Sequence, residues 1–429
     1  MNVSRLHRAG EPGVTGIDRF EAAYARQAVE SQVFSARLVT AHAGGAWREI
    51  GVASIGDVIA QEALRAPADA AAYAEISAFL HAAPSGVTRG ACVQRVRFAK
   101  PAALPGTRLR LFSVAKAFAG RQLNLSALKN AIHLQASHTL LASPDALAAL
   151  ARHNIASVHY LHDTIPLDFP EYCRPGADVT HRARITTLQR LAAMILVSSA
   201  HVAARLRSVF EQMGGLSPPV RIVPPGLAEA FKSPRPQRKS PAPYFIAIGT
   251  IEPRKNHLLL LNVWRRMAQT MAPEKMPKLV IAGWRGWENE AIVDYFNRCE
   301  ALRGHVLEIE GLPDEALADL TAGACGVLAP SFAEGYGLSL AEAAALGVPV
   351  IASDIGAHRE VWAALVGGGA IRWLDPSDGP GWLQAVADYC AAPDTDRRAP
   401  AQTPTRTLSW QDHWRAIEAI LLETLASRA

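Results

Sequence analysis

Cysteine is scarce in this chain, and no two cysteines form a C-x-x-C pair. The 429 residues hold five cysteines, scattered and odd in number: Cys92, Cys173, Cys299, Cys325 and Cys390. This pattern argues against a disulfide framework and against a structural zinc site of the usual spacing. We therefore expect a protein of a reducing compartment.

Long hydrophobic runs are also missing. No uncharged apolar run reaches about 18 residues, so we expect no transmembrane helix. The first residues carry Arg5, His7 and Arg8 with no apolar segment after them, which does not fit a signal peptide. These absences predict a cytoplasmic protein.

Several common catalytic motifs are absent. There is no G-x-x-x-x-G-K-[ST] phosphate loop, so we do not expect ATP hydrolysis, and no G-x-S-x-G elbow of an α/β-hydrolase. The string Asp394-Thr395-Asp396 imitates a metal-binding Asp-x-Asp, but it lies in a stretch rich in alanine and proline. Because this string does not follow an apolar strand, we interpret it as part of a surface loop without a metal.

What is present is an ordinary globular composition, with 49% hydrophobic and 19% charged residues, in a chain long enough for two domains. Residues 1–230 hold 24 Lys and Arg against 16 Asp and Glu, so the first half is basic. No nucleic-acid-binding motif accompanies this charge, and we expect no nucleic-acid partner. An anionic membrane surface or a phosphate-bearing acceptor fits the basic half, and so does plain solvation without a partner.

The clearest boundary is a proline-rich stretch at residues 224–243. Proline lacks an N–H donor and disfavours helix in the residue before it, so this stretch indicates a linker. We assign residues 1–226 to an N-terminal domain, 227–243 to the linker and 244–407 to a C-terminal domain. Residues 408–427 predict an amphipathic helix that packs back on the N-terminal domain.

On both sides of the linker, short apolar runs alternate with helical patterns. The apolar runs are 156–161, 193–198, 244–248, 278–282, 306–309, 326–329 and 348–352. The helical patterns are 180–191, 256–271, 288–302, 314–322 and 338–346. This alternation is typical of parallel sheets covered on both faces and predicts an α/β protein with two doubly wound domains.

Ligands of doubly wound domains bind at the carboxyl ends of the strands, so polar residues and glycines after the apolar runs are the first candidates. The richest group follows residues 326–329: Glu334, Gly335, Tyr336, Gly337, Leu338 and Glu342. Glycines before a helix N-terminus suit a phosphate group. The two carboxylates can accept hydrogen bonds from ribose and sugar hydroxyls.

A second group follows residues 244–248, where Arg254 and Lys255 stand side by side before a helix. Cations at a helix N-terminus oppose the helix dipole, and a bound anion would explain them. They are candidates to neutralise a diphosphate leaving group.

Two further candidates come from the first half of the chain. His162 follows residues 156–161 and stands beside Asp163, a position that favours a functional histidine over a structural one. Gly16 belongs to a glycine loop, residues 13–19, that opens a helix predicted at 20–29. We expect this loop to lie across the cleft from the phosphate.

Glu334 and Glu342, with seven residues between them, resemble the signature of retaining glycosyltransferases of the GT-B fold, specifically their family 4. Other segments match that family in order: 223–226, 249–256 (its cation loop), 311–314, 330–331 and 347–351. The resemblance covers most of residues 155–362. Residues 3–6 and 15–19 match more loosely and resemble a bacterial polysaccharide-assembly subgroup.

The resemblance implies two Rossmann-like domains that face each other across a cleft, and it implies donor contacts. Glu342 would bind the ribose hydroxyls, and Glu334 with the backbone of 335–338 would hold the donor sugar and phosphates. Lys255, with Arg254, would face the diphosphate.

The remaining roles follow from the same resemblance. His162 would approach the donor sugar from the N-terminal domain, and Gly16 would lie near the phosphates. Many relatives carry an arginine or serine beside the cation loop where this chain has Thr250, which we include among the donor-binding residues.

The implied activity is retaining transfer of a hexose, with mannose as first candidate, from a nucleoside diphosphate sugar to a saccharide or lipid-linked saccharide in cell-surface polysaccharide synthesis. GDP-mannose is the first donor candidate and UDP-hexoses are the second. We expect no cofactor and no metal, and peripheral contact with the inner face of the cell membrane. Two alternatives stay open: a sugar-nucleotide epimerase of the same fold, and a non-catalytic binding module.

Overall fold

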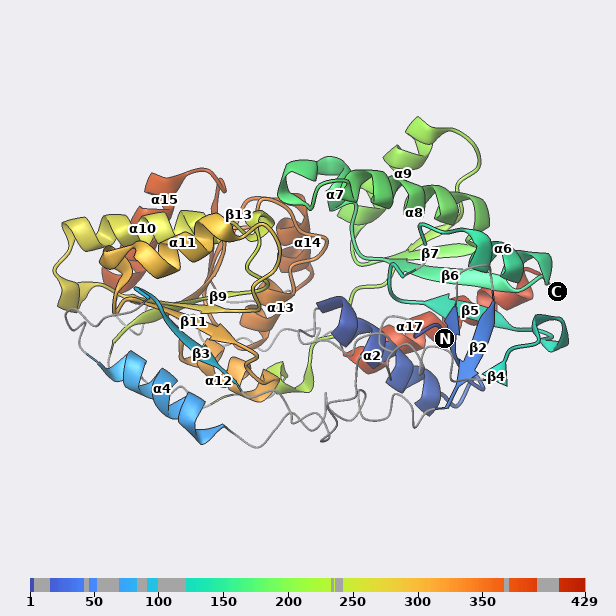
Figure 1. The fold of residues 1–429 in the computed structure, drawn as a ribbon, viewed down its shortest axis with the longest axis horizontal. Helices are drawn as coiled ribbons and strands as arrows, with labels where there is room; N and C mark the ends of the chain where they lie inside the picture. Colours follow the sequence, from blue (N-terminus) through green and yellow to red (C-terminus); the bar gives the residue numbers. More distant parts are fainter. Residues whose placement is uncertain are drawn as a thin grey trace.

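The computed structural model describes residues 1–3, 16–41, 46–51, 69–82, 91–98, 121–139, 141–232, 235, 242–365, 370–391 and 409–428. These residues form two α/β domains that lie side by side (Figure 1). The predicted fold class is therefore confirmed. Residues 4–15, which include residues 13–15 of the predicted glycine loop, and the string Asp394-Thr395-Asp396 lie outside the described residues.

The N-terminal domain is built on a parallel sheet with the order β5-β6-β7-β8. Its strands are β5 (Ile132–Gln135), β6 (Ala156–Leu161), β7 (Met194–Val197) and β8 (Val220–Ile222). Asn2 bridges this sheet to a second sheet, which is antiparallel and has the order β1-β2-β4: β1 (Leu38–Ala41), β2 (Trp47–Ile50) and β4 (Arg121–Gln122). The helices of this domain are α2 (Gly16–Glu30), α6 (Asp145–Arg152), α7 (Ile165–Asp168), α8 (Ala177–Leu191), α9 (Ala200–Met213) and α17 (Trp410–Ala426).

The C-terminal domain carries a seven-stranded parallel sheet with the order β14-β13-β12-β9-β10-β11-β3. Six of its strands follow the linker: β9 (Tyr244–Ile248), β10 (Lys278–Ala282), β11 (Val306–Glu310), β12 (Gly326–Ala329), β13 (Val350–Ser353) and β14 (Ile371–Leu374). The helices that cover them are α10 (His257–Thr270), α11 (Glu290–Arg298), α12 (Asp314–Gly323), α13 (Leu338–Ala345), α14 (Gly356–Ala364) and α15 (Gly379–Ala391).

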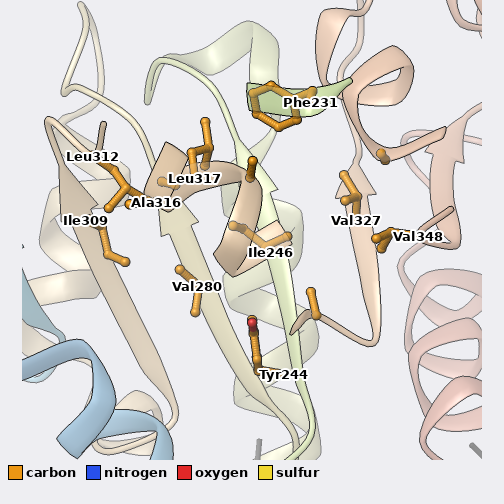
Figure 2. Close-up of a cluster of buried hydrophobic side chains, with 14 of the residues drawn as sticks. Phe231, Tyr244, Ile246, Val280, Ile309, Leu312, Ala316, Leu317, Val327 and Val348 are labelled. Carbon is orange, nitrogen blue, oxygen red and sulfur yellow. The ribbon is translucent and has the colours of Figure 1, made fainter. Parts of the chain in front are cut away.

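The two faces of this sheet hold separate hydrophobic clusters because side chains alternate along each strand. Ile246 and Val280 point to the face covered by α12, α13 and α14, together with Phe231 from the linker side (Figure 2). Phe245 and Ile281 point to the opposite face, where Trp264 of α10 is fully buried. Burial on both faces explains why these strands read as continuous apolar runs.

The seventh strand comes from the first half of the chain. β3 (Gln94–Arg97) pairs in parallel with β11, and α4 (Ala70–His81) packs its apolar residues into the C-terminal core. Arg97 Nε lies 3.1 Å from Glu310 Oε2, and Lys278 Nζ donates to Ala82 O at the end of α4 at 2.8 Å. The assignment of residues 1–226 to a single N-terminal domain is therefore wrong for residues 69–82 and 91–98, because β3 finds its hydrogen-bond partners at the open edge of β11 and α4 packs in the C-terminal core.

The start of the predicted linker packs in the C-terminal domain, whereas the last helix packs in the N-terminal domain. Leu227 and Phe231, at the start of the predicted linker, are buried in the C-terminal core. α17 lies against α2 and β6 in the N-terminal domain, with Trp414 and Ile417 in that core. In the part of the chain that the structure describes, no helix is long and apolar enough to cross a membrane.

Candidate functional site

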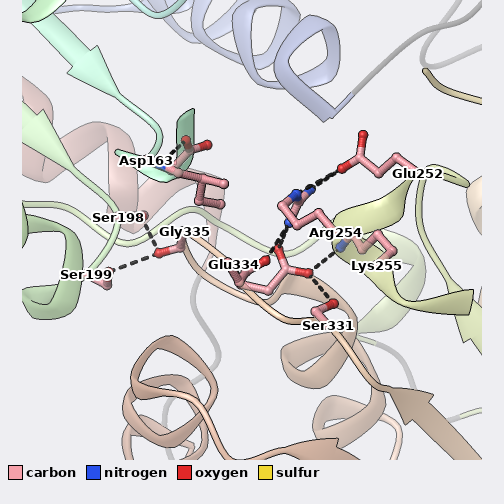
Figure 3. A network of polar contacts seen from close by, with 11 residues as sticks. Asp163, Ser198, Ser199, Glu252, Arg254, Lys255, Ser331, Glu334 and Gly335 are labelled. Atoms are coloured by element: carbon pink, nitrogen blue, oxygen red, sulfur yellow. Dashed lines mark hydrogen bonds and ion pairs between the residues drawn. The ribbon is translucent and has the colours of Figure 1, made fainter. Parts of the chain in front are cut away.

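The centre of the candidate site is Glu334, in the loop between β12 and α13 (Figure 3). Its Oε1 accepts from Lys255 Nζ at 2.5 Å and from Ser331 Oγ at 2.7 Å, and its Oε2 accepts from Arg254 Nη1 at 2.7 Å. β9 and β12 are neighbours in the sheet, so the loops after their carboxyl ends meet. The structure thus brings three of the predicted catalytic residues, Glu334, Arg254 and Lys255, into direct contact.

Arg254 is held on a second side by Glu252. Its Nε and Nη2 lie 2.9 and 2.6 Å from Glu252 Oε1. The same guanidinium donates through Nη1 to Ala333 O at 2.9 Å, and the Arg254 carbonyl accepts from Phe332 N at 2.9 Å. The cation loop and the Glu334 loop are therefore joined by side chains and by backbone.

The pKa values of the two carboxylates in this cluster shift in opposite directions. Burial alone would raise the pKa of Glu334, but the charges of Arg254 and Lys255 outweigh it and hold the pKa well below its usual range. Burial raises the pKa of Glu252, and the two cations oppose that shift only in part. Glu334 is thus an ionised hydrogen-bond acceptor with little basicity.

Lys255 reaches Glu334 across Gly249, the residue that follows β9. An ideal Cβ at Gly249 would lie 3.1 Å from Lys255 Cε and 3.3 Å from its Nζ. Gly249 also has a φ of 142°, in a region that residues other than glycine rarely adopt. A glycine here leaves the passage through which the ammonium group reaches the site.

His162 and Asp163 belong to the N-terminal domain and meet the Glu334 loop at Gly335. An ideal Cβ at Gly335 would lie 2.4 Å from His162 O and 3.0 Å from Asp163 Cβ. His162 Nε2 donates to Ala136 O at 2.7 Å, and its ring packs 4.9 Å from the ring of Phe20. His162 therefore meets this loop through its backbone, and its predicted approach to the donor sugar stays a prediction.

Other contacts between the domains surround this point. Ser198 Oγ and Ser199 Oγ each donate to Gly335 O at 3.0 Å. Glu360 of α14 accepts from the Ala200 and His201 N–H groups at 2.5 and 2.8 Å. The carboxylate thus caps the N-terminus of α9 in the other domain, where an anion is favoured.

Aromatic contacts join the domains on the same side. The rings of Tyr172 and Phe332 stack at 4.6 Å, with 8° between their planes, and Arg174 lies over Trp287 at 5.2 Å. A cavity of about 480 Å³ opens beside Glu334, between α7, the start of α9 and the start of α14. The cavity is large enough for a sugar ring.

The remaining predicted residues lie around α13. Gly337 precedes this helix with a φ of 104°, Leu338 is its first residue and is 38% exposed, and Glu342 is half-buried one turn further on. Tyr336 is half-buried, and burial followed by the charge of Glu360 raises its pKa. These placements are compatible with the predicted donor contacts, which stay predictions.

Thr250 follows Gly249 at the end of β9, where its Cγ2 approaches Gly286. Gly16 is the first residue of α2 and is the described end of the predicted glycine loop. Among the described residues, no group of three or more His, Cys, Asp or Glu side chains could hold a metal ion. The expected independence from metals remains a prediction.

Several residues of the site were not among the sequence candidates. Ser331 donates to Glu334, Glu252 accepts from Arg254, and Glu360 caps α9. Across the cleft, Ser198 and Ser199 donate to Gly335 O. Ser331 and Glu252 stand in the same loops as the candidates, so their position after a strand was the available signal. No sequence signal pointed to Ser198, Ser199 or Glu360, because their contacts depend on how the two domains dock.

Comparisons with known proteins agree with this geometry. Residues 229–372 match the family model described as "Glycosyl transferases group 1". Over 118 residues the chain is 36% identical to O-antigen chain mannosyltransferase B from Escherichia coli, covering 28% of this chain and 30% of that protein. Over 220 residues it is 28% identical to the serotype-specific mannosyltransferase WbdA from Escherichia coli, covering 47% of this chain and 26% of that protein. The matches thus span less than a third of the length of these curated relatives.

A solved structure extends the comparison to most of the fold. HepE from Anabaena, in complex with UDP and glucose, superimposes with a TM-score of 0.53 at 16% identity, over 68% of this chain and 78% of that chain. Two facing Rossmann-like domains with this arrangement define the GT-B class of fold. Within that class, the chain carries a glycosyl transferases group 1 domain at residues 229–372, which confirms the resemblance found in its sequence.

Proposed function

We propose that this protein is a retaining hexosyltransferase that takes its sugar from a nucleoside diphosphate donor. The observation that carries the proposal is the contact of Arg254 and Lys255 with Glu334 at adjoining strand ends, facing His162 of the other domain. Two cations close together match the charge of a diphosphate. The Glu334 carboxylate, which these cations release when they bind the diphosphate, would accept hydrogen bonds from the sugar.

The chemistry requires stabilisation of the departing diphosphate. Arg254 and Lys255 would neutralise the charge that develops on it, which lowers the barrier to an oxocarbenium-like transition state. The acceptor hydroxyl would attack from the face of the leaving group, with a phosphate oxygen taking its proton. Glu334 is a poor candidate for nucleophile or base, because three donors hold its carboxylate and its pKa is lowered.

The relatives favour mannose as the transferred sugar and GDP-mannose as the donor, with UDP-hexoses as the second candidates. They also favour transfer over epimerisation or a purely binding role. A saccharide or lipid-linked saccharide of a cell-surface polysaccharide is the acceptor we propose. The cavity beside Glu334 offers room for it, with Asp163, Asp168 and Arg205 in its wall.

The test is a thermal-shift panel with GDP, UDP, ADP, dTDP and CMP on wild type, Glu342→Ala and Glu290→Ala. Glu290 is an exposed carboxylate near a helix start, on α11, and serves as the matched control. We expect one nucleoside diphosphate to raise Tm by a few degrees in wild type and in the control, and not in Glu342→Ala. Absence of a shift with every nucleotide would contradict the proposal.

Retention is tested separately from donor binding. The product formed from GDP-mannose and a mannoside acceptor is analysed by NMR for the configuration of the new bond. An α-linkage, the same as in the donor, supports the retaining mechanism. A β-linkage would refute retention and leave glycosyl transfer intact.

A further inference from the structure

The guanidinium of Arg254 is bound by carboxylates on two different edges. Its Nε and Nη2 contact Glu252 Oε1 at 2.9 and 2.6 Å, and its Nη1 contacts Glu334 Oε2 at 2.7 Å (Figure 3). Since the guanidinium is planar and its donors have fixed directions, Glu252 helps to determine which way the Nη1 edge points, together with Ala333 O, which accepts from Nη1 at 2.9 Å.

The two carboxylates differ in their relation to the proposed diphosphate. Glu334 bridges Arg254 and Lys255, so an anion that binds both cations competes with Glu334 for the same N–H groups. Glu252 contacts the far edge of Arg254 and is only 1% exposed. A diphosphate can therefore replace the Glu334 contact without touching the Glu252 contact.

Glu252 has a feature that a purely structural ion pair does not need. Its Oε2 is buried and has no hydrogen-bond partner among the residues that the structure describes, where the carboxylate is held by one oxygen alone. The Arg285–Glu308 pair in the same domain shows the alternative, because both oxygens of buried Glu308 bind the guanidinium at 2.7 Å. A buried acceptor left unpaired is costly, and such groups are often retained for a functional reason.

We infer that Glu252 is a positioning residue for Arg254, which keeps its Nη1 edge turned into the cleft when a nucleoside diphosphate takes the place of Glu334. The inference rests on the proposed function, since it assumes that Arg254 faces the diphosphate of a sugar nucleotide. It assigns Glu252 a role in recognition of the second phosphate and none in binding the nucleoside.

The experiment compares binding of GDP and GMP by calorimetry to wild type, Glu252→Gln and Glu308→Gln, with UDP and UMP if uridine is the base selected in the thermal-shift panel. We expect Glu252→Gln to weaken GDP binding about tenfold while GMP binding changes less than about twofold. In Glu308→Gln, which breaks an equally buried ion pair that includes neither Arg254 nor Lys255, the ratio of the two affinities should match that of wild type. In the transfer reaction, Glu252→Gln should raise the donor KM and lower kcat together.

A second background makes the test independent of overall stability. In Arg254→Lys, which lacks the guanidinium edge, the further change Glu252→Gln should leave the ratio of GDP to GMP affinity unchanged within about twofold. If Glu252→Gln is too unstable to measure, Glu252→Asp retains the buried charge, withdraws it from the guanidinium, and should lower the same ratio.

The outcomes separate the two levels of the hypothesis. If wild type prefers GDP over GMP and Glu252→Gln has the same preference, or loses both ligands equally, the inference about Glu252 is wrong and the proposed function stands. If wild type binds no nucleoside diphosphate, the proposed function itself fails.

Discussion

Replacing Gly335 with alanine should separate the domains at the point where the proposed transfer takes place. The added Cβ would lie 2.4 Å from His162 O and 3.0 Å from Asp163 Cβ. Carbon and oxygen atoms that are not bonded do not approach to 2.4 Å, so one of the two backbones has to move. Gly335 does not have a positive φ, and alanine is therefore excluded by this contact and not by the conformation of its own backbone.

The size of the movement follows from the same contact. An ordinary separation of at least about 3.2 Å requires a displacement of nearly 1 Å between the Glu334 loop and the end of β6. The hydrogen bonds from Ser198 and Ser199 to Gly335 O, both 3.0 Å, would stretch or break. A misplacement of about 1 Å can cost on the order of a hundredfold in rate, and we expect kcat to fall by that factor.

The assay is donor-dependent transfer measured beside nucleotide binding. Nucleoside diphosphate affinity should fall by much less than kcat, because Arg254, Lys255 and Glu342 all belong to the C-terminal domain and the Gly335 loop supplies only part of the predicted donor contacts. Gly379→Ala is the control, since a Cβ there meets only Leu259 Cδ1 at an ordinary 3.8 Å. Wild-type kcat in Gly335→Ala would refute the link between this contact and catalysis.

Other predictions concern charge, pH, metal and membrane. Lys255→Met should lower kcat by about 10² to 10³ through loss of one cation at the diphosphate, and an equal effect of Lys275→Met, on the surface of the same domain, would contradict this. His159, His257 and His413 are buried, and burial lowers their pKa values to about 3, 3 and 4. Below the pKa of about 6.5 that histidine has in an unfolded chain, the unfolded state binds more protons, so Tm should fall as pH is lowered from 6.5 towards 4; a flat profile there would be the opposite of this expectation. Transfer should continue in excess EDTA. Loss of activity that only added Mg²⁺ or Mn²⁺ restores would show that Arg254 and Lys255 do not suffice to neutralise the diphosphate. Binding to anionic vesicles at low salt should weaken when several arginines of residues 1–230 are replaced, and unchanged binding would remove the membrane proposal.

The strands of the C-terminal domain were predictable because their burial is uniform. Residues 244–248, 278–282 and 326–329 form β9, β10 and β12 with the predicted bounds. A strand covered on both faces is apolar at every position, and a single sequence shows that directly. The sequence also predicted that Glu334, Arg254 and Lys255 follow two of these strands, but the contact among them required the pairing of β9 with β12, which the sequence did not predict.

β3 shows the opposite case. Its sequence, Gln-Arg-Val-Arg, has one apolar residue, and only Val96 is buried. Its partner strand β11 is far away in sequence, so no local sequence pattern predicts the pairing. The contacts of Ser198, Ser199 and Glu360 across the cleft were equally hidden, because they depend on the relative position of two domains.

The pairing of β3 with β11 also bears on the order in which the protein is assembled during translation. Arg97 and Glu310, which pair across these strands, are 213 residues apart. At about 5 to 20 residues per second, the ribosome needs on the order of 10 to 40 s to make the second partner after the first. During that interval the C-terminal core, in which the apolar residues of α4 are buried in the folded protein, has not yet been made. The apolar residues of α4 are therefore exposed on the nascent chain until the C-terminal domain is made, and exposed apolar surface is what chaperones bind. The C-terminal half made alone would leave the edge of β11 unpaired.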